Sequence, residues 1–175
     1  MLYFQPWVGT GYQAGGDLGF RLLLLGESHY GVVEDYLPSF TISCVNQLAI
    51  EQDRHLFFNR VQRTIQGPSS PIGKDERSAF WHGVAFANFI QEFPGSAHNA
   101  RPTTSQWKAG RSALPQLLRT LKPDCMVVLG KGVGHWLPHV DCAHIVIRHP
   151  SSRGFSPSTW HPVVRDGLGA YLESR

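Results

Sequence analysis

RLLLLGESHYG, residues 21–31, places four consecutive leucines directly before a glycine and a run of polar residues. A short apolar run bounded by glycines is typical of a central strand that is buried on both faces. Glu27, Ser28 and His29 follow at the carboxyl end of this strand, where open α/β sheets place their functional groups. The segment therefore predicts a buried strand of a parallel sheet with a candidate site behind it.

Three further apolar runs have the length and the glycine or polar boundaries of strands: VAFANFI (84–90), DCMVVLG (124–130) and AHIVIRHPSS (143–152). Helical spacing of apolar residues fills the intervals between them. Four strands separated by helices predict a three-layer α/β/α sandwich with a central, mainly parallel, four-stranded sheet. The length of 175 residues fits a single domain over 1–175.

Two helix boundaries can be predicted from individual residues. Thr41 is a candidate N-cap for one long or two shorter helices through residue 65. Thr103 or Thr104 is a candidate N-cap for a helix that reaches about Leu121 and is bent or interrupted at Pro115.

The composition excludes several classes of protein. It is 42% hydrophobic and 17% charged, which is typical of a globular domain, and no apolar run approaches the roughly 20 residues of a membrane helix. The three cysteines form no C-x-x-C pair, which argues against a zinc or iron–sulfur site. The N-terminus lacks the pattern of a secretory signal. We expect a cytoplasmic monomer with no membrane partner, whose net charge of +3 comes from basic residues spread along the chain.

Candidate site residues follow each of the four predicted strands: Glu27 and Ser28, Asn88, Gly130, and His149. The carboxyl ends of parallel strands lie at one edge of a sheet, so these groups are predicted to converge on a single crevice.

The same motifs, in the same order, resemble the uracil-DNA glycosylase superfamily over residues 20–156. LLLLGESHYG corresponds to its first-strand motif, VAFANFI to its Asn-ending strand, LKPDCMVVLG to its L-x-P strand and HIVIRHPSS to its late H-P-S loop. The resemblance implies a glycosylase-like fold, with DNA or a free nucleobase or nucleotide as partner and no metal or other cofactor.

The resemblance also implies a role for each matching residue. His149 would stabilise the departing base and Glu27 would orient water or offset the cationic sugar, which makes these two the catalytic candidates. Asn88 would read the edge of the base, Tyr30 would crowd the pyrimidine ring and Phe40 would stack on it. Gly26, Ser28 and His29 would complete the base-binding motif, and Ser151, Ser152 and Arg153 would contact DNA phosphates.

The sequence departs from the family at the first motif. Ser28 stands where the main uracil-DNA glycosylases have a water-activating aspartate. The iron–sulfur members read G-E-A-P-G, so Glu27 matches, whereas His29 and Tyr30 replace proline and glycine and the four cluster cysteines are absent. The resemblance therefore implies the fold more strongly than the activity.

A serine esterase is the main alternative. LGES resembles the G-D-S block of SGNH-type esterases, and Asp141 and His144 fit their D-x-x-H pattern. Ser28 would attack the acyl carbon, His144 would act as general base and Asp141 would orient it.

A non-catalytic module that binds nucleotides or nucleic acid is the third hypothesis. GKGVG (130–134) lacks the spacing of a phosphate-binding loop, and a helix-opening turn is its expected role. His135 and His139 stand four residues apart, but Pro138 between them argues against a metal site.

Overall fold

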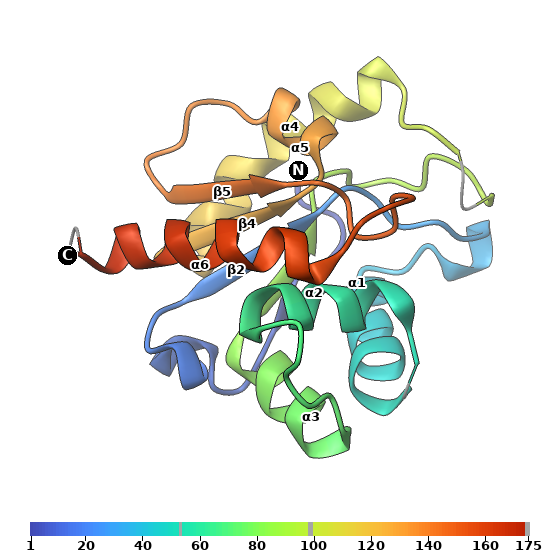
Figure 1. Cartoon of the computed structure of the whole chain (residues 1–175). Coiled ribbons are helices and arrows are strands. Elements are labelled where there is room, and N and C mark those ends of the chain that lie inside the picture. The colour runs from blue at the N-terminus through green and yellow to red at the C-terminus, as the bar shows by residue number, and fades with distance from the viewer. Residues whose placement is uncertain (53, 98–99, 174–175) are drawn as a thin grey trace.

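The computed structural model of the chain describes residues 1–52, 54–97 and 100–173. Within this part, a five-stranded sheet is surrounded by helices (Figure 1). The strands are β1 (Trp7–Val8), β2 (Leu22–Gly26), β3 (Ala85–Asn88), β4 (Cys125–Leu129) and β5 (Ala143–Ile147). The α-helices are α1 (Phe40–Cys44), α2 (Leu56–Gln66), α3 (Lys74–Gly83), α4 (Thr104–Leu121), α5 (Lys131–Trp136) and α6 (Pro157–Glu173). Single turns of 3₁₀-helix are η1 (Tyr12–Ala14), η2 (Gly16–Leu18) and η3 (Val33–Asp35), and η4 (Val45–Glu51) is a π-helix.

The sheet has the order β1-β3-β2-β4-β5, and β3, β2, β4 and β5 are parallel. The prediction of a mainly parallel α/β sheet is confirmed, but the prediction of four strands is wrong. The fifth strand, β1, pairs antiparallel with β3 through only two residues, Trp7 and Val8. So short a segment carries no hydrophobic period, which is why the sequence pattern missed it.

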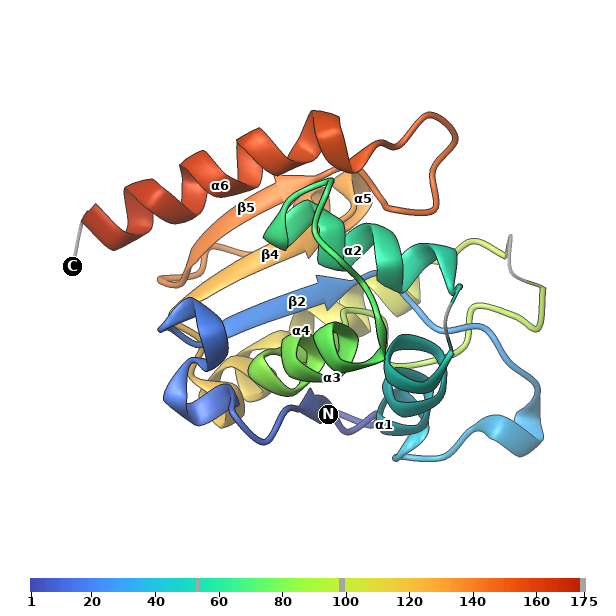
Figure 2. The ribbon, with the colours of Figure 1, turned by 60° about the horizontal axis from the view of Figure 1, so that its bottom comes forward.

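Helices cover both faces of the sheet and bury separate cores (Figures 1 and 2). One face packs Leu22 and Leu24 of β2 against α2, α3, α6 and η4. The other face packs Leu23 and Leu25 against α4 and α5. All four leucines are fully buried, as the sequence predicts for a central strand. Among the described residues, no helix combines the length and the apolar character that crossing a membrane requires.

Helix α4 begins and ends where the sequence predicts, but it is not interrupted at Pro115. Thr103 is its N-cap: its side chain accepts a hydrogen bond from the Gln106 amide, and the Gln106 side chain accepts one from the Thr103 amide. Pro115 lies inside the helix without ending it. Because Pro115 is on the exposed face, water can hydrate the carbonyl that loses its intrahelical donor. The candidate N-cap Thr41 instead lies inside α1, one residue after its start.

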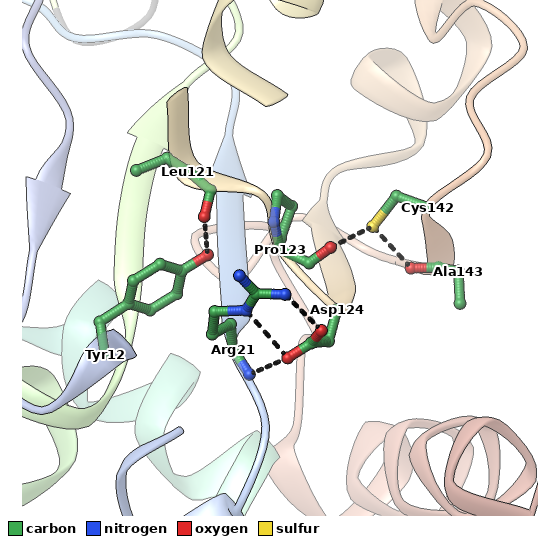
Figure 3. Close-up of polar contacts among 7 residues, drawn as sticks. All are labelled: Tyr12, Arg21, Leu121, Pro123, Asp124, Cys142 and Ala143. Atoms are coloured by element: carbon green, nitrogen blue, oxygen red, sulfur yellow. Dashed lines mark hydrogen bonds and ion pairs between the residues drawn. The ribbon is translucent and has the colours of Figure 1, made fainter. Parts of the chain in front are cut away.

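The amino ends of β2 and β4 are joined by a charged pair (Figure 3). The Arg21 guanidinium donates to both Asp124 carboxylate oxygens, at 2.8 and 3.1 Å, and the Arg21 backbone amide donates to the same carboxylate at 2.7 Å. Nearby, the Tyr12 hydroxyl donates to the Leu121 carbonyl at 3.3 Å. A bidentate pair of this kind fixes the relative positions of the two strands at the edge opposite the candidate site.

At the carboxyl edge, the pairing of β2 with β3 extends beyond both strands. Gly26 lies beside Asn88 in the register, and the amides of Phe89 and Ile90 donate to the carbonyls of Gly26 and Glu27, both at 2.9 Å. A side chain at Gly26 would collide with Asn88 Oδ1. Glycine at this position therefore lets the Asn88 side chain lie against the end of β2.

We predict that Gly26→Ala destabilises the protein by about 1–3 kcal/mol, because the new methyl group must displace the Asn88 amide in a packed region. Urea unfolding measures the free energy. Gly169→Ala in α6 is the matched control, because nothing lies within 4 Å of a Cβ there. The control should be unchanged or stabilised by up to about 1 kcal/mol. Equal stability of Gly26→Ala and wild type would contradict the close approach.

Candidate functional site

A pocket of about 590 Å³ opens at the carboxyl edge of the sheet. In Figure 2 the arrowheads of β2, β4 and β5 point to this edge, where the segments that follow β2 and β5 leave the sheet. Its lining comes from the strand ends, from α1, η4 and α2, and from two loops. The lining residues are Glu27, Ser28, His29, Tyr30, Phe40, Cys44, Leu48, His55, Phe57, Phe58, Phe86, Asn88, Arg101, His149, Ser151 and Ser152.

Most residues selected from the sequence lie together in this pocket: Glu27, Ser28, His29, Tyr30, Phe40, Asn88, His149, Ser151 and Ser152. Gly26, Gly130 and Arg153 do not line it. Gly26 instead provides space for Asn88, Gly130 lies beside Glu27 and His149, and Arg153 lies exposed in the loop that follows Ser152. Residues that end or follow β2, β3 and β5 therefore line one pocket, and their chemical roles stay predictions.

His149 follows β5, and the backbone sets the orientation of its ring. The Ser151 amide donates to His149 Nδ1 at 3.1 Å, so the proton of the neutral ring lies on Nε2. Burial lowers the pKa of His149 below its ordinary value, and the positive charge of Arg101 lowers it further. At neutral pH the ring is consequently a neutral donor through Nε2.

Helix α2 holds the loop that carries His149. Arg60 donates through Nη1 to the Pro150 carbonyl at 2.8 Å, and its guanidinium lies 6.0 Å from the centre of the Phe155 ring. Within the loop, the Ser152 amide donates to the His149 carbonyl at 2.9 Å. The Phe57 ring lies 5.6 Å from the His149 ring, between centres, and packs on the same loop. The position of His149 thus depends on both β5 and α2.

Glu27 lies at the end of β2, close to the start of α5. A Cβ built on Gly132 would be 3.3 Å from Glu27 Oε2, and one built on Gly130 would be 3.9 Å from it. The same position on Gly130 would be 3.7 Å from His149 Cδ2. Gly132 therefore leaves room for the carboxylate, and the two distances from Gly130 show that Glu27 and His149 lie near the same point. Burial raises the pKa of Glu27, and the charge of Arg101 opposes that rise.

Arg101 also lines the pocket, although no sequence pattern identifies it as a site residue. It is exposed, lies before α4 and influences both Glu27 and His149 electrostatically. No hydrogen bond or ion pair joins its side chain to any other residue in the described ranges. It stands in an irregular segment, where no hydrophobic period identifies a role.

Asn88 ends β3 and is 4% exposed. Its backbone carbonyl accepts a hydrogen bond from Gln91 Nε2 at 2.7 Å, whereas its side-chain amide makes none within the described residues. Gln91 in turn accepts from the amides of Tyr3 and Phe4 through Oε1. The Asn88 amide is therefore held at the pocket with its hydrogen-bonding capacity unused.

His29 connects the segment after β2 to α1. Its Nε2 lies 2.8 Å from Thr41 Oγ1, and its ring packs edge-on against Phe4 and Phe40. Burial lowers the pKa of His29 to about 4, so the ring is neutral at neutral pH. These contacts fix the segment after β2 against Phe40 and Thr41 of α1, and Phe40 lines the pocket.

The residues proposed for a serine esterase are not brought together. In the register, His144 is level with Met126 and Leu23, near the amino end of the sheet, whereas Ser28 follows its carboxyl end. Ser28 is five residues after Leu23, and five residues of extended chain span roughly 16 Å. The Ser28 Oγ is fully covered and has no partner in the described part of the chain, so no general base activates it.

The structure also places the residues considered for a phosphate-binding loop and for a metal site. GKGVG opens α5, with Gly130 at its N-cap, as expected of a helix-opening turn. His135 and His139 are both exposed, and His139 lies 3.7 Å from Asp141. Among the described residues, no group of three His, Cys, Asp or Glu side chains is placed to hold a metal ion.

Basic residues are spread along the chain, as expected, whereas acidic residues are concentrated in its first half. Residues 1–92 contain six basic and nine acidic residues, and residues 93–175 contain ten basic and four acidic residues. The basic half supplies Arg101 to the pocket, and its exposed Lys131 and Arg153 adjoin pocket residues in sequence. A count by segment would have shown this pattern.

Comparison with known proteins adds no relative: no family model matches the chain, and no curated protein matches it either.

We predict that Arg101→Gln raises the pKa of both His149 and Glu27. Removing the positive charge makes the imidazolium easier to form and the carboxylate harder to form. NMR titration of the two side chains measures both values. Arg119→Gln is the matched control, because Arg119 lies in the last turn of α4, which leads to the amino end of β4. An unchanged pair of pKa values in Arg101→Gln would contradict the shared electrostatic coupling.

Proposed function

We propose that this protein takes an altered nucleobase of DNA, such as uracil, into the pocket and hydrolyses its N-glycosidic bond. The observation that supports this most is the meeting of His149, Glu27 and Asn88 at three strand ends around one pocket. The order of motifs that resembles the uracil-DNA glycosylases gives the same proposal from the sequence.

His149 is suited to stabilise the leaving base. When the bond between C1′ of the sugar and the base nitrogen breaks, the electron pair passes to the base and negative charge develops on its carbonyl oxygens. The Nε2–H of a neutral imidazole, held by the Ser151 amide, donates a hydrogen bond to such an oxygen. Because the ring is oriented before the reaction, little reorganisation is needed as the charge develops.

Glu27 is suited to the sugar side of the reaction. A carboxylate offsets the positive charge that develops on the sugar, and it accepts a proton from the water that adds to C1′. Partial burial, which raises its pKa, strengthens both interactions by reducing screening by solvent. Glu27 therefore takes over in this chain the role of the aspartate that Ser28 replaces.

Asn88 is suited to read the base. A base reaches such a pocket only after it leaves the stack, and it is then recognised through its hydrogen-bonding edge. The side-chain amide of Asn88 offers one donor group and one acceptor group at the buried end of the pocket. Phe40 and Tyr30 also line the pocket and supply aromatic surface for contact with the base.

The surroundings of the pocket favour a polyanion. Arg101, Lys131 and Arg153 are exposed cations without ion pairs among the described residues, and Ser151 and Ser152 add hydroxyl groups at the mouth. Such contacts bind phosphates and position a nucleic acid without reading its sequence. Recognition of the base without cleavage is the second candidate, because Ser28 stands in place of the family's aspartate.

The test is incubation with single- and double-stranded oligonucleotides that carry uracil or other deaminated bases, followed by detection of abasic sites. We predict that His149→Ala lowers the cleavage rate by about 100- to 1,000-fold, the usual effect of removing one donor to a developing anion. His144→Ala is the matched control, because this exposed histidine lies toward the opposite edge of the sheet.

The control variant should retain full activity. Unchanged cleavage by His149→Ala would contradict the role of the imidazole. Salt-sensitive DNA binding without product would support recognition alone, and the absence of both product and binding would refute the proposed function.

A further inference from the structure

The outer face of α4 carries a row of cations that lies outside the pocket. Its four members are all exposed: Lys108, Arg111, Arg119 and Lys122. An α-helix turns by about 100° and rises by about 1.5 Å per residue, so these residues fall within an arc of about 80° and a length of about 21 Å. We call this row the α4 stripe.

The α4 stripe keeps its positive charge because no carboxylate neutralises it. Helix α4 contains no Asp or Glu. Glu92 contacts α4 from the opposite side, where it accepts a hydrogen bond from Gln106 Nε2 at 3.4 Å, and Asp124 is bound by the Arg21 guanidinium. Within residues 1–52, 54–97 and 100–173, no hydrogen bond or ion pair joins the side chain of a stripe residue to another residue.

Helix stability alone does not account for this arrangement. Lys108 and Arg111 are three residues apart, as are Arg119 and Lys122, and like charges at this spacing repel each other on a helix. Lys122 also has a left-handed backbone conformation, with a φ of 47°, which glycine adopts more readily. The helix dipole favours Arg119 and Lys122 at the end of α4, but it gives no such benefit to Lys108 and Arg111.

Two stacked tryptophans border the α4 stripe at its amino end. The rings of Trp107 and Trp136 have centres 5.9 Å apart and planes 7° apart, and both side chains are partly exposed. Trp107 stands four residues before Arg111 and therefore on the same side of α4. Proteins bind single-stranded nucleic acids with this combination, because bases stack on the aromatic rings and the backbone follows the cations.

The tryptophan pair lies next to the pocket. A Cβ built on Gly132, in the first turn of α5, would be 3.6 Å from Trp107 Cη2 and 3.3 Å from Glu27 Oε2. Helix α4 begins three residues after the pocket residue Arg101 and ends at Leu121, just before β4. The α4 stripe therefore runs from the pocket side of the sheet toward its amino edge, on the face opposite α2 and α6 (Figure 2).

We propose that the α4 stripe and the Trp107–Trp136 pair bind a single strand of nucleic acid outside the pocket. Bases of the strand stack on the indoles, and the phosphates that follow contact the stripe. A duplex lacks this mode of binding, because its bases are stacked inside and do not reach the indoles. The inference goes beyond the proposed function, since it adds a second contact surface and requires no cleavage in the pocket.

The first test measures the binding of a labelled oligodeoxythymidine of about 20 nucleotides by fluorescence anisotropy. We predict that Lys108→Gln/Arg111→Gln weakens binding about ten-fold or more. The slope of log Kd against log salt concentration should fall by about 1.4, because about two phosphate contacts are lost.

The matched control is Lys74→Gln/Arg63→Gln, which removes one exposed lysine and one exposed arginine from α3 and α2, on the other face of the sheet. This variant should change the Kd by less than about two-fold, because distant exposed charges are screened by salt. Equal weakening in the two double variants would show an effect of net charge alone and would overturn the inference.

The second test removes one indole. Trp136→Leu should weaken oligodeoxythymidine binding about five-fold or more and leave the salt slope unchanged, because stacking is lost and the phosphate contacts are kept. Trp160→Leu in α6 is the control, since Trp160 is also partly exposed and stacked on an aromatic ring, that of Phe155. Circular dichroism checks that each variant folds. Unchanged binding by Trp136→Leu, or equal weakening by the control, would contradict the stacking surface.

The choice of probe separates this inference from the proposed function, because oligodeoxythymidine contains no altered base. Binding that depends on the α4 stripe, without abasic sites from any substrate, would support the inference and refute cleavage. Cleavage of uracil in DNA, with equal oligodeoxythymidine affinity in Lys108→Gln/Arg111→Gln and wild type, would do the reverse. Equally tight binding of a duplex of the same length, or of polyglutamate, would also overturn the inference, because neither presents an exposed base.

Discussion

The parallel pairing of β2 with β3 is the interaction on which the candidate site depends. It continues past the strands through the hydrogen bonds from Phe89 and Ile90 to Gly26 and Glu27. This extended ladder holds Gly26 level with Asn88 and places Glu27 one residue further along, at the end of the sheet. The absence of a side chain at Gly26 lets Asn88 approach the end of β2. At the opposite edge, the Arg21–Asp124 pair fixes β2 against β4. β4 in turn pairs with β5, the strand that precedes His149.

The electrostatics of the pocket favour the neutral form of His149 and act on Glu27 in two opposing ways. Burial and Arg101 both favour the neutral form of His149, while Arg101 favours the ionised form of Glu27 against burial. One exposed cation thus lowers the pKa of both groups and favours the deprotonated form of each. Arg101 lines the pocket, and Lys131 and Arg153 adjoin pocket residues in sequence; the proposed contact with DNA phosphates rests on these three cations.

Much of the fold and of the polar part of the site could be predicted from the sequence. The four leucines of β2 and the polar residues after them predict a buried strand that ends in candidate site residues. Because parallel strands end at one edge of a sheet, the residues after the predicted strands are expected to share one site. The order of those ends along the chain supplied Glu27, Asn88 and His149 without a structure. The sequence also counts against the esterase residues, because His144 is second in the predicted run 143–152, and the register confirms that it lies near the amino end of β5.

The residues that the sequence did not reveal depend on tertiary structure. Leu48, Phe57 and Phe58 have the spacing of ordinary core residues, and only the path of η4 and α2 past the sheet brings them to the pocket. Arg101 lies in an irregular segment where no period identifies a role. Strand β1 is two residues long, too short for any pattern. Pro115 suggested an interruption of α4, but it lies on a face that water reaches.

The most direct test of the shared site is an NMR titration of isotope-labelled protein with a free nucleobase. If Glu27, Asn88 and His149 surround one base, the His149 ring and the Asn88 side-chain amide should shift together, with the same dependence on base concentration. The Nε2 proton of His149 should show the largest change, because it donates to the base. Shifts confined to one of these side chains, or to residues outside the pocket, would contradict the shared site.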